Sequence, residues 1–106
     1  MIYLASPYSD PSEAVRIERV RLTDAFVARH LQQGIALFSP ILYGQLFEEL
    51  IGSDAAAWEA IDEDFIGAAS AMWVLCLPGW KQSKGVQLEI AKWEFVTGRL
   101  PEFKQT

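Results

Sequence analysis

Two short apolar runs, each followed at once by a Ser-Pro pair, constrain the fold of this chain most. The first run spans residues 2–5 and the second spans residues 35–38. Apolar runs of this length, stopped by a residue that cannot donate to a sheet ladder, are typical of buried strands. Between them, apolar residues recur near helical spacing as far as Gly34. The pattern therefore predicts a strand, a helix and a second strand, joined as one βαβ unit.

The helix of this unit is expected to begin near Pro11. Asp10 precedes that proline, and Glu13 follows Asp10 by three positions, which resembles a capping pattern with proline in the first helical position. Residues 41–53 mix apolar side chains with two glycines. We interpret them as a short helix followed by a loop.

The second half of the chain continues the alternation of helices and strands. A helix capped by Ser53 or Asp54 is expected to extend to about Ala69, and an apolar strand follows it. A last long helix should then begin after a cap at Ser83. The expected bounds are 72–77 for this strand, 83–98 for the last helix and 100–103 for a short strand at the sheet edge, where proline is tolerated.

Together these elements predict a single α/β domain over residues 1–106. Its expected architecture is a three-layer sandwich of flavodoxin or Rossmann type, with four or five mostly parallel strands and helices on both faces. A chain of 106 residues with 51% hydrophobic content can bury one core but has no room for a second domain.

The overall charge and the single cysteine exclude several classes of function. The net charge is −5, from 14 acidic and 9 basic residues, which argues against polymeric DNA or RNA as a partner. Cys76 lies in an apolar run and is expected to pack in the core, and His30 has no second histidine to share a metal. No signal peptide or spanning segment is evident. We therefore expect a cytoplasmic protein without membrane contact, metal or cofactor.

The start of the last helix carries the strongest functional signal. Ser83, Gly85 and Glu89 follow the predicted strand directly. Ligands of open α/β sheets bind beyond the carboxyl ends of the strands, where a helix N-terminus offers unpaired N–H groups to negative charge. The alternative is a simple N-cap and a glycine needed for close packing. The first interpretation predicts a small anionic or sugar-bearing ligand.

Two carboxylates lie where the helices should face the sheet. At about 100° per residue, Asp62 falls at about 40° from Trp58 and inside the apolar stripe, whereas Glu63 and Asp64 point away. A carboxylate in that position must be paired, protonated or set at a water-accessible site. Glu89 lies at about 60° from the apolar direction of its helix. The alternative for Glu89 is a surface ion pair with Lys92.

Other candidates come from the strand ends. Tyr3 either packs in the core or points across the strand ends, and its hydroxyl needs a partner if it is buried. Trp80 either stacks on a base or covers the edge of the core. The remaining side chains expected to face the ligand, without an assigned chemistry, are Ser6, Pro7, Tyr8, Ser9, Ser39 and Pro40.

These residues carry a family resemblance. The sequence Ile-Tyr-Leu-Ala-Ser-Pro at 2–7, the aspartate before the third strand, and Ser83-x-Gly85-x-x-x-Glu89 after it resemble the nucleoside 2-deoxyribosyltransferase-like superfamily. Within it, the chain is most similar to a small bacterial and phage group, DUF1937, with an LASPYS start and an LPGWxxSxGxxxE signature. The resemblance extends from the N-terminus to about residue 98, and the serine, glycine and glutamate spacing is its most specific part.

The resemblance implies roles for individual residues. Glu89 would attack the anomeric carbon of a deoxynucleoside, Asp62 would act as acid and base for the departing base, and Tyr3 would orient the nucleophile. Ser83 and Gly85 would hold a 5′-phosphate. A carboxylate nucleophile and a second acid form the pair that retaining glycosidases use.

The resemblance also implies a homodimer or a higher homo-oligomer. The chain departs from the monophosphate hydrolase branch by three extra residues, 78–80, before Ser83, so the rim of the pocket must differ. The expected function is hydrolysis or base exchange at the N-glycosidic bond of a deoxynucleoside or its 5′-monophosphate. The alternatives are a non-catalytic protein that binds or sequesters nucleotides, and an interaction module that uses the four tryptophans.

Overall fold

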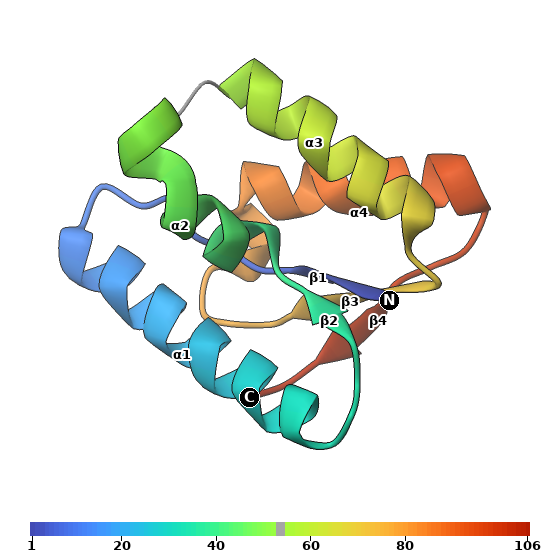
Figure 1. Cartoon of the computed structure of the whole chain (residues 1–106), viewed down its shortest axis with the longest axis horizontal. Coiled ribbons are helices and arrows are strands. Elements are labelled where there is room, and N and C mark those ends of the chain that lie inside the picture. Colours follow the sequence, from blue (N-terminus) through green and yellow to red (C-terminus); the bar gives the residue numbers. More distant parts are fainter. Residues whose placement is uncertain (53–54) are drawn as a thin grey trace.

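A sheet of parallel strands forms the centre of the molecule (Figure 1). The structure, a computed structural model, describes residues 1–52 and 55–106, and within them four strands pair in the order β2-β1-β3-β4. Every pairing is parallel. The strands are β1 (Ile2–Ala5), β2 (Leu37–Phe38), β3 (Ala71–Leu75) and β4 (Glu102–Lys104).

Helices cover both faces of this sheet. They are α1 (Glu13–Gln32), α2 (Pro40–Ile51), α3 (Ala55–Ala68) and α4 (Lys84–Thr97), with a short 3₁₀ turn η1 (Trp80–Gln82) before α4. Helix α1 lies against one face, whereas α3 and α4 pack together over the other (Figure 1). The structure is thus a three-layer, Rossmann-like sandwich, as the sequence predicts.

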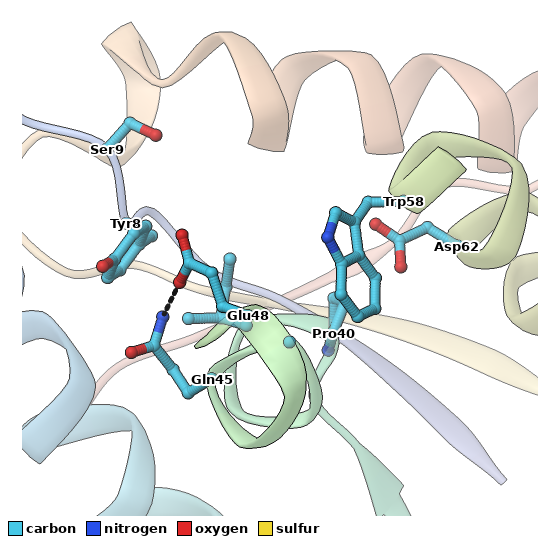
Figure 2. A pocket seen from close by; sticks show the side chains of 9 residues that line it. Tyr8, Ser9, Pro40, Gln45, Glu48, Trp58 and Asp62 are labelled. Carbon is cyan, nitrogen blue, oxygen red and sulfur yellow. Dashed lines mark hydrogen bonds between the residues drawn. The ribbon is translucent and has the colours of Figure 1, made fainter. Parts of the chain in front are cut away.

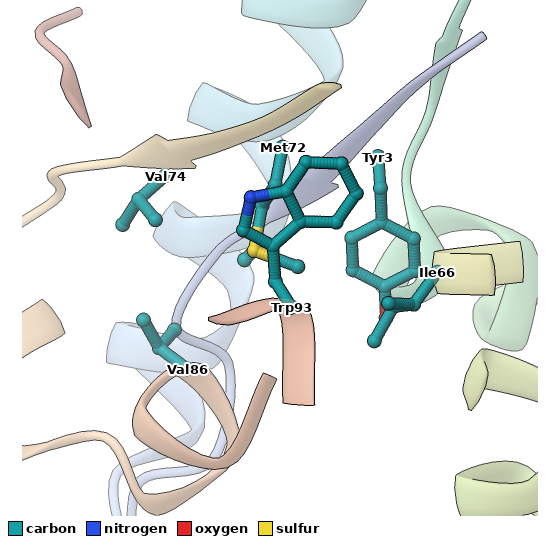
Figure 3. Close-up of a cluster of buried hydrophobic side chains, with 7 residues drawn as sticks. Tyr3, Ile66, Met72, Val74, Val86 and Trp93 are labelled. Atoms are coloured by element: carbon teal, nitrogen blue, oxygen red, sulfur yellow. The ribbon is translucent and has the colours of Figure 1, made fainter. Parts of the chain in front are cut away.

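The side-chain alternation of β1 and β3 divides the core in two. Leu4 and Leu75 face α1 and join its buried Phe26 and Val27. Tyr3, Ala5, Met72 and Val74 face the opposite side, where they meet Ile66 of α3 and Val86 and Trp93 of α4 (Figure 3). Tyr3 is therefore held on the side of the sheet that α3 and α4 cover.

Helix α2 begins at the carboxyl end of β2. Ser39 caps it, because the backbone N–H of Leu42 donates to the Ser39 hydroxyl at 3.2 Å, and Pro40 occupies the first turn, where no N–H is needed. This helix of 12 residues is longer than the short helix expected within 41–53, and residue 53 lies outside the described residues. It places its side chains beside the loop that follows β1.

Several predicted boundaries differ from the structure. The cap predicted at Asp10 is wrong: Ser12 caps α1 by accepting from the N–H of Val15 at 3.4 Å, since the Asp10 carboxylate already accepts from the N–H of Ser12 at 2.9 Å. The observed β2 and β3 are shorter than predicted, and β4 begins after Pro101. The predicted caps at residues 53 and 54 lie outside the described residues.

The last helix follows the prediction closely. Ser83 caps α4, and Gly98 ends it in the left-handed conformation, with φ of 67°. Within the part of the chain that the structure describes, no helix is both long and apolar enough to cross a bilayer.

Candidate functional site

A tyrosine and a glutamate from distant parts of the chain meet beneath the strand ends. The hydroxyl of Tyr3, on β1, donates a hydrogen bond to Oε2 of Glu89, on α4. Tyr3 is fully buried, and burial followed by the charge of Glu89 raises its pKa well above the usual range. The Tyr3 hydroxyl therefore stays protonated and acts as a fixed donor to Glu89.

Asp62 lies on α3 next to this pair. It is half-buried, whereas Glu63 and Asp64 are exposed, so the helical phase predicted for Asp62 is confirmed. Burial raises the pKa of Asp62 to about 6, and the charge of Lys92 opposes the rise. The charge of Asp62 in turn raises the pKa values of Tyr3 and Glu89. The three groups therefore share one electrostatic environment.

Glu89 has the most perturbed carboxyl group of the site. Burial raises its pKa to about 8; the hydrogen bond from Tyr3 lowers it, Asp62 raises it and Lys92 lowers it. Because the charge of Asp62 contributes to the raised pKa of Glu89, ionisation of one carboxyl group disfavours ionisation of the other. Between about pH 6 and about pH 8 the pair holds one proton and one negative charge. Burial, the main cause of both shifts, raises the pKa of Glu89 further than that of Asp62.

Lys92 ties α4 to α3 beside the two carboxyl groups. Its ammonium lies 2.8 Å from a carboxylate oxygen of Glu59 and 2.9 Å from one of Glu63. The alternative of a surface ion pair between Glu89 and Lys92 is therefore wrong, since Lys92 pairs across the helices. Its two acidic partners are exposed, so these bridges link α4 to α3 but contribute little to stability.

A hollow of about 240 Å³ opens beside Asp62 at the carboxyl ends of the strands (Figure 2). Its walls come from the loop after β1, from α2 and from α3. The lining residues are Tyr8, Ser9, Pro40, Ile41, Gly44, Gln45, Glu48, Trp58 and Asp62. Glu89 and Tyr3 are not part of this lining. Asp62 is the residue that belongs to both the hollow and the carboxylate pair, so it links them.

The two ends of the hollow differ in chemistry. Trp58 stands one turn before Asp62 on α3, and its indole N–H donates to the carbonyl of Gly52 at 3.3 Å, which orients the ring. In Figure 2, Gln45 and Glu48 lie across the hollow from Trp58, near Tyr8, and the Gln45 amide donates to Glu48 at 3.5 Å. An aromatic face thus lies opposite a polar end rich in acceptor oxygens.

Three of the predicted contacts at the strand ends line this hollow, namely Tyr8, Ser9 and Pro40. The Ser39 hydroxyl is instead engaged as the cap of α2. Ser6 and Pro7 are buried, and the Ser6 hydroxyl has no hydrogen-bond partner among the described residues. These two residues support the loop from below rather than line the hollow.

The predicted anion site at the start of α4 is open. The hydroxyl of Ser83 accepts from the N–H of Val86 at 3.3 Å, which leaves its own proton free to donate. A Cβ added at Gly85 would meet no atom closer than the Ser83 hydroxyl, at 4.0 Å, so close packing does not require this glycine. Trp80 lies outside the lining of the hollow, and its ring packs on Phe103 at 5.3 Å.

Sequence reasoning missed Gln45, Glu48 and the wall formed by Trp58. A signal was present, because residues 41, 44, 45 and 48 recur at the spacing of one helical face directly after the second Ser-Pro pair. Among residues 1–52 and 55–106, no three side chains of His, Cys, Asp or Glu gather where they could hold a metal ion.

The raised pKa of Glu89 predicts a stability that depends on pH. The folded protein binds this proton up to about pH 8, whereas the ordinary pKa of glutamate is 4.5. Between these values the folded state holds more protons than the unfolded state, so the free energy of unfolding falls as pH rises. Glu89→Gln removes that contribution. In urea unfolding at pH 5, 6, 7 and 8, the free energy of unfolding of the variant should rise relative to that of the wild type with each increase in pH.

Glu94→Gln, on the exposed side of the same helix, is the matched control and should follow the wild-type curve. A constant difference between Glu89→Gln and the wild type across this pH range would contradict the raised pKa.

One comparison with known proteins bears on this site. Residues 1–104 match the family model described as a domain of unknown function, DUF1937. The match includes the strand ends, the hollow and both carboxyl groups. No curated protein matches the chain.

Proposed function

We propose that this chain, which belongs to the DUF1937 family, cleaves the N-glycosidic bond of a deoxynucleoside or its 5′-monophosphate. The observation that carries the proposal is the hydrogen bond from Tyr3 to Glu89, and it is supported by Asp62 of α3, whose carboxyl group also has a raised pKa. One carboxylate and one carboxylic acid are what a retaining glycosidic displacement requires.

In the first step, an ionised Glu89 attacks C1′ of the sugar. A bond forms between the carboxylate oxygen and C1′ while the bond from C1′ to the base nitrogen breaks. The electron pair passes to that nitrogen, which takes the proton of Asp62. This step requires the proton on Asp62 and the charge on Glu89, whereas the pKa values in the free protein, about 6 for Asp62 and about 8 for Glu89, favour the opposite arrangement.

Substrate binding supplies a reason for this exchange of protonation. Asp62 lines the hollow, so a bound base would exclude water from it and raise its pKa further. Glu89 keeps the hydrogen bond from Tyr3, which favours the charged form. The ligand thus favours movement of the proton from Glu89 to Asp62, which prepares the nucleophile only in the occupied site.

In the second step, the ionised Asp62 removes a proton from a water molecule, whose oxygen attacks C1′ and releases Glu89. With a second base in place of water, the same step rebuilds a nucleoside. The two outcomes are hydrolysis and base exchange, and the choice depends on which acceptor reaches C1′ first.

The hollow also suggests which part of the substrate lies where. The ring of Trp58 offers a stacking face for a base, and the oxygens of Glu48 and Gln45 accept hydrogen bonds from amino groups. The open start of α4 at Ser83 and Gly85 suits a 5′-phosphate. We therefore expect cytosine, adenine or guanine nucleotides to be preferred over thymine nucleotides, which carry no amino group.

A non-catalytic nucleotide-binding protein is the second candidate. It is favoured by the raised pKa of Glu89, because a protonated carboxyl is a poor nucleophile. Incubating the purified protein with the four deoxynucleosides and their monophosphates, followed by chromatography, separates the two. Release of free base is the expected result, and adding a second base tests exchange. Thermal stabilisation by a ligand with no base released would favour binding alone.

A further inference from the structure

One arginine connects the two loops that border the proposed site. The guanidinium of Arg19, a partly buried residue in the first half of α1, donates from Nη1 to the carbonyls of Tyr8 at 3.3 Å and Ser9 at 3.0 Å. Its Nη2 donates to the carbonyl of Pro78 at 3.1 Å. The first two carbonyls follow β1 and the third follows β3. Three hydrogen bonds from one planar group thus join segments about 70 residues apart in sequence.

The backbone beside Pro78 is shaped to fit this guanidinium. Gly79 has a φ of 88°, in the left-handed region that side chains rarely adopt. A Cβ added to it would lie 2.6 Å from Nη2 of Arg19. Pro78 and Gly79 therefore accommodate the guanidinium, and η1 begins at the next residue, Trp80.

Each of the two joined loops leads to a different part of the proposed site. Tyr8 and Ser9 line the hollow. The segment after Pro78 continues through η1 into Ser83 and Gly85, where α4 begins. Arg19 therefore fixes the wall of the hollow, where the base is proposed to bind, relative to the proposed anion site at Ser83 and Gly85.

We infer that Arg19 is a positioning residue, which holds the loop after β1 and the loop after β3 in the arrangement that a nucleotide needs. The inference rests on the proposed function for its link to substrate. The three hydrogen bonds from Arg19 to the two loops, which we call the Arg19 clamp, can be tested without any ligand. Lysine cannot replace arginine fully, because an ammonium is a compact charge and does not present a planar fork of donors to several carbonyls.

Hydrogen exchange measures the clamp directly. The N–H groups of Trp80, Gln82 and Ser83 are bonded within the turn after Pro78. In Arg19→Ala we expect these amides to exchange roughly 10-fold faster, since the bonds that hold the turn are lost. The exchange rates of these amides in Arg19→Lys should lie between those of the wild type and those of Arg19→Ala. Arg21→Ala, which removes only an exposed pairing with Glu18, is the matched control and should leave these rates unchanged.

A double-mutant cycle tests the contact at Gly79. Gly79→Ala introduces both a strained φ and a clash with Arg19, whereas in an Arg19→Ala background only the strain remains. The fold-change in the unfolding equilibrium constant caused by Gly79→Ala should be smaller in that background. Equal fold-changes in both backgrounds, or exchange rates for Arg19→Ala that match those of Arg21→Ala, would overturn the clamp.

The link to substrate has its own measurement. Tyr3 and Glu89 lie on β1 and α4 rather than in these loops, so Arg19→Ala should raise KM for a monophosphate roughly 10-fold or more while kcat falls by less. A fall confined to kcat would overturn the positioning role. If the wild-type protein releases no base, the proposed function fails, and the exchange rates still decide whether Arg19 holds the loops.

Discussion

Replacing Glu89 with glutamine is expected to lower the rate of base release at least about 10³-fold, because an amide cannot form the glycosyl ester of the first step. Glutamine keeps the size of the side chain and an oxygen that can accept from the Tyr3 hydroxyl. The fold should therefore survive. The measurement is kcat/KM for the best substrate of the chromatographic panel, together with the circular dichroism spectrum.

A control variant makes this result specific. Glu94→Gln, on the exposed side of the same helix, should keep wild-type activity. A folded Glu89→Gln variant that retains more than a tenth of the wild-type rate would mean that another group attacks the sugar, and the assignment of the nucleophile would be abandoned.

Replacing Asp62 with asparagine is expected to lower the rate about 10²- to 10⁴-fold and to change the shape of the pH profile. In the wild type, activity should fall below about pH 6, where both carboxyl groups are protonated and no nucleophile is present. It should also fall above about pH 8, where both are ionised and no proton is available for the base. Asp62→Asn has no such acid to lose, so its residual activity should not decline on the alkaline side.

A substrate with a better leaving group separates this role from a structural one. The base of 7-methyl-2′-deoxyguanosine already carries a positive charge and departs without protonation. Asp62→Asn should therefore be affected far less with this substrate than with 2′-deoxyguanosine, whereas Glu89→Gln should be inactive with both. Asp64→Asn, which is exposed on the same helix, is the control. An equal loss with both substrates in Asp62→Asn would exclude its role as the acid.

The sequence was sufficient to predict the parts of the site that depend on local periodicity. The helical phase of α3 separates Asp62 from its acidic neighbours, and the cap at Ser83 follows from the residues around it. The hydrogen bond between Tyr3 and Glu89 joins residues 86 positions apart. This bond depends on which face of β1 meets α4. Periodicity along the sequence does not determine that face, so it leaves both core packing and catalysis open for Tyr3.

The parts that could not be predicted depend on contacts between loops and helices. The arginines of α1 have the composition of a solvated face, and only the tertiary structure brings Arg19 to the carbonyls after β1 and β3. The same holds for Lys92, whose partners lie on α3 rather than on its own helix. Long polar side chains can reach partners on other elements as well as on their own helix. The spacing of residues along one helix indicates only the partners on that helix.

The predicted homo-oligomer stays a prediction. Large apolar side chains are exposed on α1, α2 and α4, including Leu50 on α2, which is 81% exposed, and Phe95 on α4, which is 92% exposed. Association of two copies could cover such side chains.

Trapping the glycosyl intermediate tests the central claim most directly. A 2′-fluorinated deoxynucleoside slows both steps, because fluorine destabilises the positive charge that develops at C1′, and the intermediate should accumulate when a good leaving base drives the first step. After acid quenching and proteolysis, mass spectrometry should find the fluorosugar on the peptide that contains Glu89, and none in Glu89→Gln. Release of the base without any adduct, or an adduct on another residue, would contradict nucleophilic attack by Glu89.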